Sequence, residues 1–340
     1  MSDIYFSHKS DTEEVPVVDT YDEDSAPLKP KSPFGKAIKV FFALILILAL
    51  FFASLTAYIF FLMQKTDYNS GGSKNNVYVD KNELYSDKDV FNVLLIGIDA
   101  RAKDIASRSD SMVLFSIDTK NKKIKLTSFM RDIWLTLPQH KTYAKLNASC
   151  TYGGARYVID TIEYNFNVAI DSYALVDFEA FMSIVDSLGG VDVEVTEKEA
   201  ANLREEFFQN VQAGESVHLN GTEALWYCRI RYLDSDFMRT YRQRKVLTSL
   251  FEKASQAGPA KLIPLAKEIL PLVETDLSPA DLTALSVKGM FYYRTFEIEQ
   301  ARIPIDGTWK DAYKKGQAVL EVDLGANQVF LEEFLYSKAG

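Results

Sequence analysis

Hydrophobic positions form one long uninterrupted run near the N-terminus and several short patterned segments after it. The long run, Val40–Met63, carries no charged residue and as a helix would extend about 36 Å, enough to cross a bilayer. A cleaved signal peptide is the alternative, but its apolar region has only roughly 7 to 15 residues. Basic residues lie mainly before the run, at Lys29, Lys31, Lys36 and Lys39, and only Lys65 lies just after it. Because positive charge marks the cytoplasmic side, the sequence predicts one membrane-spanning helix with a cytoplasmic N-terminus.

The segments around this run differ in composition. Residues 1–39 are rich in Asp, Glu, Ser and Pro, which predicts a disordered acidic cytoplasmic tail. Residues 64–90 contain "NSGGSKNN" and read as a polar extracytoplasmic linker. With 340 residues, 47% of them hydrophobic, the chain can bury a sizeable core, which we assign to an extracytoplasmic domain over residues 91–340.

Strand and helix patterns alternate after residue 90. The continuous apolar run "FNVLLIGIDAR" predicts a strand buried on both faces, and "SMVLFSID" and "KIKLTSF" predict two more strands joined by the turn "DTKNKK". From Gly153, "GGARYVIDTIEYNFN" has helical spacing, "FEAFMSIVDSLGG" is a helix ending at glycine, and "VDVEV" is a strand.

The second half of the domain is richer in helix. "LNGTEALWYCRIRY" predicts about two helical turns after a threonine cap, followed by an extended stretch. "RTYRQRKVLTSLFEKASQAG" is a long helix, and "AKLIPLAKEILPLV" is a helix broken by Pro264 and Pro271. We therefore expect an α/β (mixed α+β) domain with a central mixed sheet and helices on both faces.

Arginines gather in one segment of this acidic chain, whose net charge is -9. Arg229 and Arg231 are two apart and would share a face of an extended segment. Arg239, Arg242 and Gln243 would share a helix face that turns Arg244 away. Guanidinium groups suit bidentate contact with phosphate, and a helix N-terminus favours an anion. This segment alone leaves two alternatives open: a phosphate or pyrophosphate site, and a solvated basic face paired with nearby acids.

A second segment carries related chemistry. "GIDARAKDIASRSDSM" places Asp99, Arg101, Arg108 and Asp110 in the loop between the first two strands, where α/β folds bind ligands. Paired carboxylates suggest Mg²⁺, or Mn²⁺, which binds one or two carboxylates together with substrate phosphates. Arg131 follows the next strand. A salt bridge is the alternative for each carboxylate, but three segments with the same chemistry favour a metal and anion site.

Cysteine and histidine add little to this picture. Cys150 and Cys228 are too few for a disulfide scaffold, and either one bridge or two free buried thiols fits the sequence. The histidines are isolated, so a zinc site is not expected.

These motifs together resemble the LytR-CpsA-Psr family of cell-envelope proteins. The matching pieces cover about residues 91–250 in the family's order: "NVLLIGIDAR", "RSDSMVLFSID", "FMRDIWLTLP", "KLNASCTYGG", "DFEAFMSIVDSLGGVDVEV", "LNGTEALWYCRIRY" and "DSDFMRTYRQRKVL". The resemblance implies a membrane-anchored phosphotransferase. It would move a glycopolymer (teichoic acid, capsule or a related wall polysaccharide) from a polyprenyl-pyrophosphate carrier in the membrane to a peptidoglycan hydroxyl.

The family pattern also implies roles for individual residues. Asp99 and Asp110 would hold Mg²⁺, and with Arg108 and Arg131 they would form the catalytic group. The pyrophosphate would be bound by Arg101, Arg108, Arg131, Arg229, Arg231, Arg239, Arg242 and Gln243. A general base is not evident, and Asp99 or Asp110 qualifies only if it is not committed to metal. The helices "ARYVIDTIEYNF" and "FEAFMSIV" could line a lipid trough, although we expect most of their apolar residues to face the core.

Two other classes of protein compete with a transferase. A nucleic-acid-binding regulator (a transcriptional attenuator) is disfavoured because the arginines are predicted to be extracellular, the protein is acidic and no helix-turn-helix is evident. A non-catalytic polyprenyl-phosphate binding module would carry the same arginines. The paired aspartates are the feature that discriminates it from an enzyme.

Overall fold

A computed structural model describes residues 45–47, 49–50, 53–54, 56–62, 64, 67–68, 75–99, 107–206, 210–231 and 233–336. Contacts divide the chain into two units, residues 1–52 and residues 53–340, and all elements below belong to the second. The predicted tail 1–39 lies outside the described residues, and the predicted span Val40–Met63 lies partly outside them. No helix within the described part of the chain is long and apolar enough to span a membrane.

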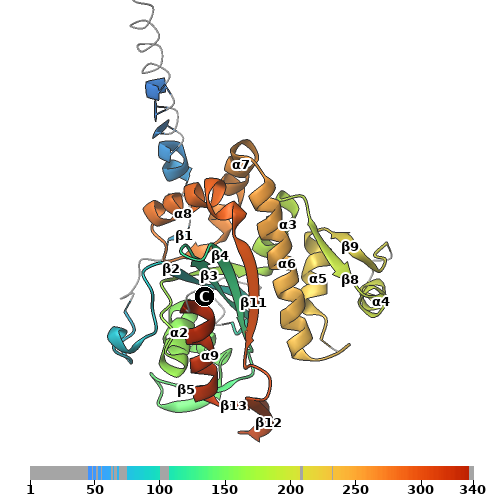
Figure 1. Ribbon diagram of the computed structural model, residues 1–340. Coiled ribbons are helices and arrows are strands. Elements are labelled where there is room, and N and C mark those ends of the chain that lie inside the picture. The colour runs from blue at the N-terminus through green and yellow to red at the C-terminus, as the bar shows by residue number, and fades with distance from the viewer. Residues whose placement is uncertain are drawn as a thin grey trace, which may run out of the picture. The chain divides into compact units, whose positions relative to one another are not determined.

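Among the described residues, a seven-stranded mixed sheet forms the centre of the domain (Figure 1). Its spatial order is β1 (Asp67–Tyr68), β10 (Glu274–Thr275), β7 (Ser172–Asp177), β2 (Val90–Ile98), β3 (Ser109–Asp118), β4 (Lys123–Phe129) and β11 (Glu297–Ile303). The pairs β2–β3 and β3–β4 are antiparallel, whereas β2–β7 and β4–β11 are parallel. The mixed sheet and the three strands predicted around residues 91–129 are confirmed.

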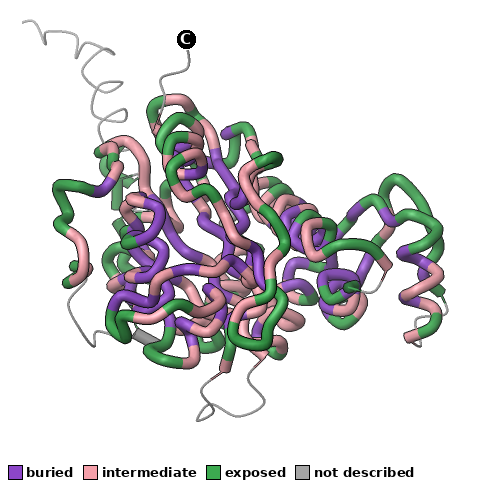
Figure 2. The backbone as a smooth tube through the Cα atoms, turned by 90° about the horizontal axis from the view of Figure 1, so that it is seen from below, coloured by how far each residue is buried: buried purple, intermediate pink, exposed green. Residues whose placement is uncertain are grey.

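Helices cover both faces of the sheet, as predicted. Side chains alternate along a strand, so Met112 and Leu114 of β3 face one side while Val113 faces the other. The first face packs against α2 (Ala148–Phe166) and α9 (Leu324–Tyr336). The second packs against α6 (Asp236–Gln256), α8 (Pro279–Phe291) and the short helix η3 (Tyr293–Thr295). Figure 2 shows the buried backbone in purple within these layers.

A further group of elements packs on α6 away from the sheet. It contains α3 (Phe178–Ser187), α4 (Glu197–Glu205), α5 (Gly221–Arg229) and the two-stranded sheet of β8 (Val191–Val195) and β9 (Gly214–Leu219). Val185, Tyr227 and Val246 are fully buried in its core. The predicted strand "VDVEV" is therefore present, but it pairs with β9 and does not join the central sheet.

Three local predictions differ from the structure. The helix α2 begins before the predicted Gly153, and its backbone kinks at Gly153 and Gly154, the latter with φ of 65°. Pro264 lies inside α7 (Pro259–Ile269) and does not break it. The helix gives way to η2 (Leu270–Leu272), which contains Pro271. The N-cap of α5 is Asn220 and not a threonine, because Asn220 forms a capping box with Glu223.

Several elements have no counterpart among the sequence predictions. Examples are α4, η1 (Lys81–Glu83), the central strands β7 and β11, the helices α8 and α9, and two hairpins, β5 (Trp134–Leu137) with β6 (Thr142–Lys145) and β12 (Trp309–Lys314) with β13 (Gln317–Val322). Part of the predicted linker contacts α2: the Asn76 side-chain amide donates to Glu163 Oε2 at 3.1 Å.

Candidate functional site

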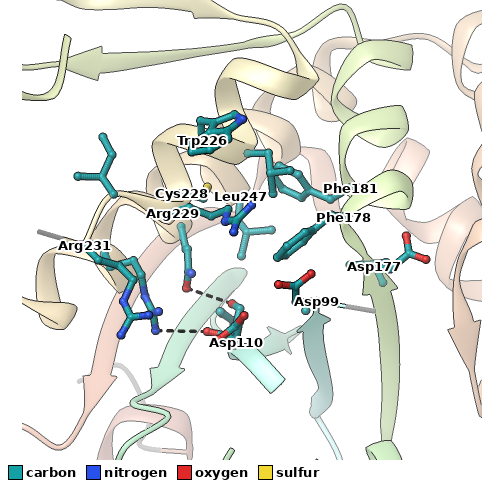
Figure 3. A pocket seen from close by; sticks show the side chains of 18 of the residues that line it. Asp99, Asp110, Asp177, Phe178, Phe181, Trp226, Cys228, Arg229, Arg231 and Leu247 are labelled. Atoms are coloured by element: carbon teal, nitrogen blue, oxygen red, sulfur yellow. Dashed lines mark hydrogen bonds between the residues drawn. The ribbon is translucent and has the colours of Figure 1, made fainter. Parts of the chain in front are cut away.

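A cavity of about 430 Å³ lies at one end of the central strands, under the helices α3, α5 and α6 (Figure 3). Parallel strands β2 and β7 both end here, and β3 begins here, so the residues that follow or start these strands meet. A bulge between Gly97 and Ile98 ends the regular pairing of β2 just before Asp99. The sheet thus brings Asp99 and Asp110 to one cavity.

Asp110 is held in place from two sides. Its Oδ1 accepts a hydrogen bond from Arg131 Nη1 at 2.7 Å, and its backbone carbonyl accepts one from Arg239 Nη2 at 3.3 Å. Arg131 therefore reaches the site through Asp110 and not through the cavity wall. Its neighbour Asp132 forms a 2.6 Å ion pair with Lys145.

The donor set at this position suits a hard divalent cation. Asp99 and Asp110 supply carboxylate oxygens to one cavity, which is the ligand type and number that Mg²⁺ takes when substrate phosphates and waters complete its octahedron. Within the residues that the structure describes, no three His, Cys, Asp or Glu side chains cluster as a metal site. A metal here would therefore take its remaining ligands from substrate and water.

Arg239 is the buried cation of the site. It is 3% exposed, and its Nη2 donates to Asp236 Oδ2 at 3.1 Å. Its buried Nε has no hydrogen-bond partner among the described residues. Burial lowers the pKa of Arg239 to about 10, against the opposing effect of Asp236. A guanidinium that is desolvated and incompletely bonded beside a cavity is suited to receive an anion.

Gln243 lies one helical turn after Arg239 and faces the same cavity. Its Oε1 accepts a hydrogen bond from Ser111 Oγ at 3.1 Å. Ser111 follows Asp110 directly and also lines the cavity, although the sequence analysis did not select it. The sequence could have indicated Ser111, because it lies next to Asp110 at the start of a predicted strand.

Arg229 and Arg231 both line the cavity, but not on one extended segment as predicted. Arg229 is the last residue of α5, and the chain leaves the helix at Ile230. The Arg229 guanidinium lies over the rings of Phe178 and Trp226, with its central carbon 4.8 and 5.3 Å from their centroids. These cation–π contacts orient Arg229.

The sequence analysis missed both aromatic partners of Arg229. Trp226 precedes Arg229 by three residues, a spacing that shares a helix face, and Phe178 follows the end of β7 directly. Figure 3 shows Asp99 and Asp110 at the strand ends, with Phe178, Phe181 and Trp226 on the helices across the cavity.

Asp177, Asn202 and Glu206 also line the cavity, and the rest of its wall is largely apolar. It includes Leu95, Val113, Phe181, Leu225 and Leu247. Of the two helices considered for a lipid trough, only α3 contributes, through Phe178 and Phe181. The apolar side chains of α2 pack into the core on the first face of the sheet.

Three other arginines of the sequence analysis, Arg108, Arg242 and Arg244, do not line the cavity. Arg242 is buried on another side of α6 and bonds Glu199 at 2.6 Å. Arg108 is exposed and is not part of the cavity wall. Arg101 lies outside the described residues. Arg244 turns away from the cavity, as its helical spacing predicts, and donates to Ser128 Oγ at 2.8 Å.

Cys150 and Cys228 are both buried and both free, so no bridge joins the segments that carry them. Cys228 lies on α5 and lines the cavity. Burial raises the pKa of Cys228 to about 12 and that of Cys150 to about 11.

The model of the LytR_cpsA_psr family matches residues 58–330 of this chain. The chain belongs to the LytR_cpsA_psr family. This match confirms the resemblance seen in the motifs. It also extends it beyond residue 250, into the C-terminal elements β11 to α9 that the motifs did not cover.

Two curated LytR_cpsA_psr relatives come from Bacillus subtilis (strain 168). The polyisoprenyl-teichoic acid–peptidoglycan teichoic acid transferase TagV is 35% identical over 228 residues, 64% of this chain and 57% of TagV. The polyisoprenyl-teichoic acid–peptidoglycan teichoic acid transferase TagT is 30% identical over 283 residues, 81% of this chain and 86% of TagT. This chain thus spans less than two thirds of TagV.

A solved structure of the family shares the fold. It is the LytR-CPS2A-psr family protein YwtF (TagT) with bound octaprenyl pyrophosphate lipid. Its TM-score is 0.58 at 25% identity, and the match covers 79% of this chain and 98% of that one.

Proposed function

We propose that this protein is a phosphotransferase that moves a glycopolymer from a polyprenyl-pyrophosphate carrier to a hydroxyl of peptidoglycan. One observation carries the proposal: a single cavity combines Asp99 and Asp110 at the strand ends, an incompletely bonded buried guanidinium and a largely apolar wall. This combination suits a ligand with a diphosphate head and a prenyl chain. The names of TagV and TagT, and the octaprenyl pyrophosphate bound to TagT, support the same reaction class.

The cavity offers a charged region to the diphosphate of the lipid-linked glycan and an apolar region to its prenyl chain. Arg239, Gln243 and Arg231 would bind the diphosphate oxygens near the strand ends. The apolar residues Leu95, Val113 and Phe181 would contact the prenyl chain, which gains free energy by leaving water. Arg229 lies between these regions, because its guanidinium contacts aromatic rings while its charge faces the cavity.

The reaction needs little covalent help from the protein. The acceptor hydroxyl oxygen attacks the phosphorus that carries the glycan, and a new P–O bond forms as the hydroxyl proton is released. The bond from that phosphorus to the bridging oxygen breaks, and polyprenyl phosphate leaves with the electron pair. The glycan is then joined to peptidoglycan through a phosphodiester. Alignment of the reactants and neutralisation of the leaving phosphate by Arg239 and Arg231 are the main contributions of the chain.

We propose that Asp99 and Asp110 hold Mg²⁺, or Mn²⁺, beside the diphosphate. When bound, the cation supplies neutralisation of charge on the phosphate oxygens. Arg131 fixes the Asp110 carboxylate through one oxygen and leaves the other oxygen to a ligand.

A non-catalytic polyprenyl-phosphate binding module is the second candidate. Two carboxylates beside a bound diphosphate would repel it unless a cation lies between them, so a site selected only for binding gains nothing from Asp99 and Asp110. The aspartate pair therefore favours an enzyme.

The paired aspartates also supply the test. Asp99→Asn, Asp110→Asn and chelation by EDTA should each lower glycan transfer at least about a hundredfold, the scale of one lost transition-state contact. Affinity for the lipid donor should change much less, because the arginines remain. Asp311→Asn, at an exposed residue of β12, is the matched control. If the wild-type protein shows no glycan transfer, or if EDTA and both substitutions leave the transfer rate unchanged, the proposal of a non-catalytic binding module would replace that of an enzyme.

We propose further that the domain lies outside the cell, held by one span with its N-terminus in the cytoplasm. The lysine asymmetry around Val40–Met63 supports this topology.

A further inference from the structure

Arg242 directs its whole guanidinium away from the cavity, although it lies on the same helix as Arg239 and Gln243. It is 1% exposed, and each of its three nitrogens contacts an acceptor. Nε donates to Glu199 Oε1 at 2.6 Å, Nη1 donates to the Ile230 carbonyl at 3.2 Å, and Nη2 bonds Asp234 Oδ2. These bonds engage all three guanidinium nitrogens on the side of α6 away from the cavity, so Arg242 does not reach a diphosphate there.

Two of the acceptors mark the ends of the connection between α5 and α6. Ile230 is the C-cap of α5 and stands between Arg229 and Arg231, which both line the cavity. Asp234 directly precedes Ser235, the N-cap of α6. One buried side chain therefore fixes both ends of the connection that carries Arg231.

The third acceptor anchors Arg242 from the other side. Glu199 is 5% exposed, and its Oε2 accepts bonds from the backbone N–H and the hydroxyl of Thr196 at 2.8 and 2.9 Å. Burial alone would raise the pKa of Glu199, but the bonds from Thr196 and Arg242 outweigh it and lower that pKa. Both charges therefore persist in the interior, where hydrogen bonds between charged groups are strong.

We infer that Arg242 is a positioning residue, which holds the Ile230–Asp234 connection so that Arg231 faces the diphosphate. The inference rests on the proposed function and replaces the role that the family pattern implied for Arg242. Arg242 acts through Arg231 and does not touch the substrate.

The sharpest test removes the Asp234 carboxylate and keeps the buried Arg242–Glu199 pair. The Asp234 side chain is 28% exposed, so Asp234→Ala leaves the Arg242–Glu199 pair in place and should fold. Binding of geranylgeranyl pyrophosphate to the full-length protein in detergent should weaken about tenfold, the loss expected for one orienting charge-assisted hydrogen bond. Asp234→Asn, which keeps a hydrogen-bonding oxygen, should restore part of this loss.

The direction in which Asp234→Ala changes the affinity for the probe distinguishes a positioning role from the direct effect of removing a negative charge. Removing a negative charge near an anion site favours anion binding by itself. Weaker binding by Asp234→Ala would therefore report a change of geometry. Glu194→Ala is the control, because it removes an ion pair with Lys245 of the same helix, at 3.2 Å, that does not involve the connection. Its affinity should match the wild type, with a similar change in thermal midpoint.

A double-mutant cycle with Arg231→Ala gives a readout that a purely structural role would not move. If Asp234 acts through Arg231, then Asp234→Ala in the Arg231→Ala background should weaken binding no further, within about twofold. Additive losses, or unchanged affinity of Asp234→Ala, would overturn the inference and leave the proposed function standing. Failure of the wild-type protein to bind the probe would overturn both.

Discussion

Arg239 and Arg242, two of the three buried arginines of α6, should respond in opposite ways to the same substitution. Arg239 faces the cavity and, among the described residues, has one carboxylate within hydrogen-bonding distance, that of Asp236. Burial lowers the pKa of Arg239 to about 10. That depression corresponds to roughly 3 kcal/mol for keeping the guanidinium charged in the fold. The cost applies at every pH below about 10 and diminishes above it, because a base with a lowered pKa destabilises the fold while it is charged.

Arg239→Met should therefore stabilise the protein at neutral pH. Methionine fills similar volume without a charge, and Asp236 remains partly exposed at the first turn of α6, where a carboxylate is favourable. After allowance for the lost bonds, we expect the free energy of unfolding to rise by about 1–2 kcal/mol. Affinity for geranylgeranyl pyrophosphate should fall by about tenfold to a hundredfold, the scale of one or two charge-assisted hydrogen bonds.

Arg242→Met is the matched comparison one turn away. Here the substitution leaves the buried Glu199 without its cation, and removing one partner of a buried pair costs about 3–5 kcal/mol. The two variants should thus move the free energy of unfolding in opposite directions. Urea unfolding of the full-length protein in detergent, followed by fluorescence of its three tryptophans, measures both. Destabilisation of Arg239→Met by more than about 1 kcal/mol, or unchanged donor affinity, would refute the assignment of Arg239 as an electrostatically strained ligand.

Two further predictions concern topology and the thiols. Protease added to intact protoplasts should digest the chain beyond about Gln64 and spare residues 1–39, since the lysines before Val40–Met63 mark the cytoplasmic side; a protected domain would contradict this. Because burial raises the pKa of Cys150 to about 11 and of Cys228 to about 12, iodoacetamide at pH 8 should label both slowly in the native protein and rapidly in urea. Mass spectrometry that finds a disulfide, or fast native labelling of both, would contradict the buried free thiols.

The part of the fold that forms the base of the site could be predicted because its signals are local. β2, β3 and β4 follow each other along the chain as antiparallel neighbours, their apolar runs are buried on both faces, and a short turn joins β3 to β4. The same locality explains why Asp99 and Asp110 line one cavity: they lie at the ends of two strands that pair directly. The other strands of the described sheet, β1, β10, β7 and β11, were not predicted. β11 was missed because it pairs with β4 across more than 160 residues, and "EIEQARI" has an edge strand's mixture of polar and apolar positions.

The separation of Arg239 from Arg242 could not be predicted, and the reason lies in helix geometry. With 3.6 residues per turn, positions i+3 and i+4 fall about 60° and about 40° to opposite sides of position i. Arg242 and Gln243 thus point to different neighbours although both share a broad face with Arg239. Gln243 meets Ser111 of β3, whereas Arg242 meets Glu199 of α4, a helix that the sequence analysis did not predict. A buried acid on an element that the sequence did not reveal therefore draws Arg242 away from the cavity that Arg239 lines.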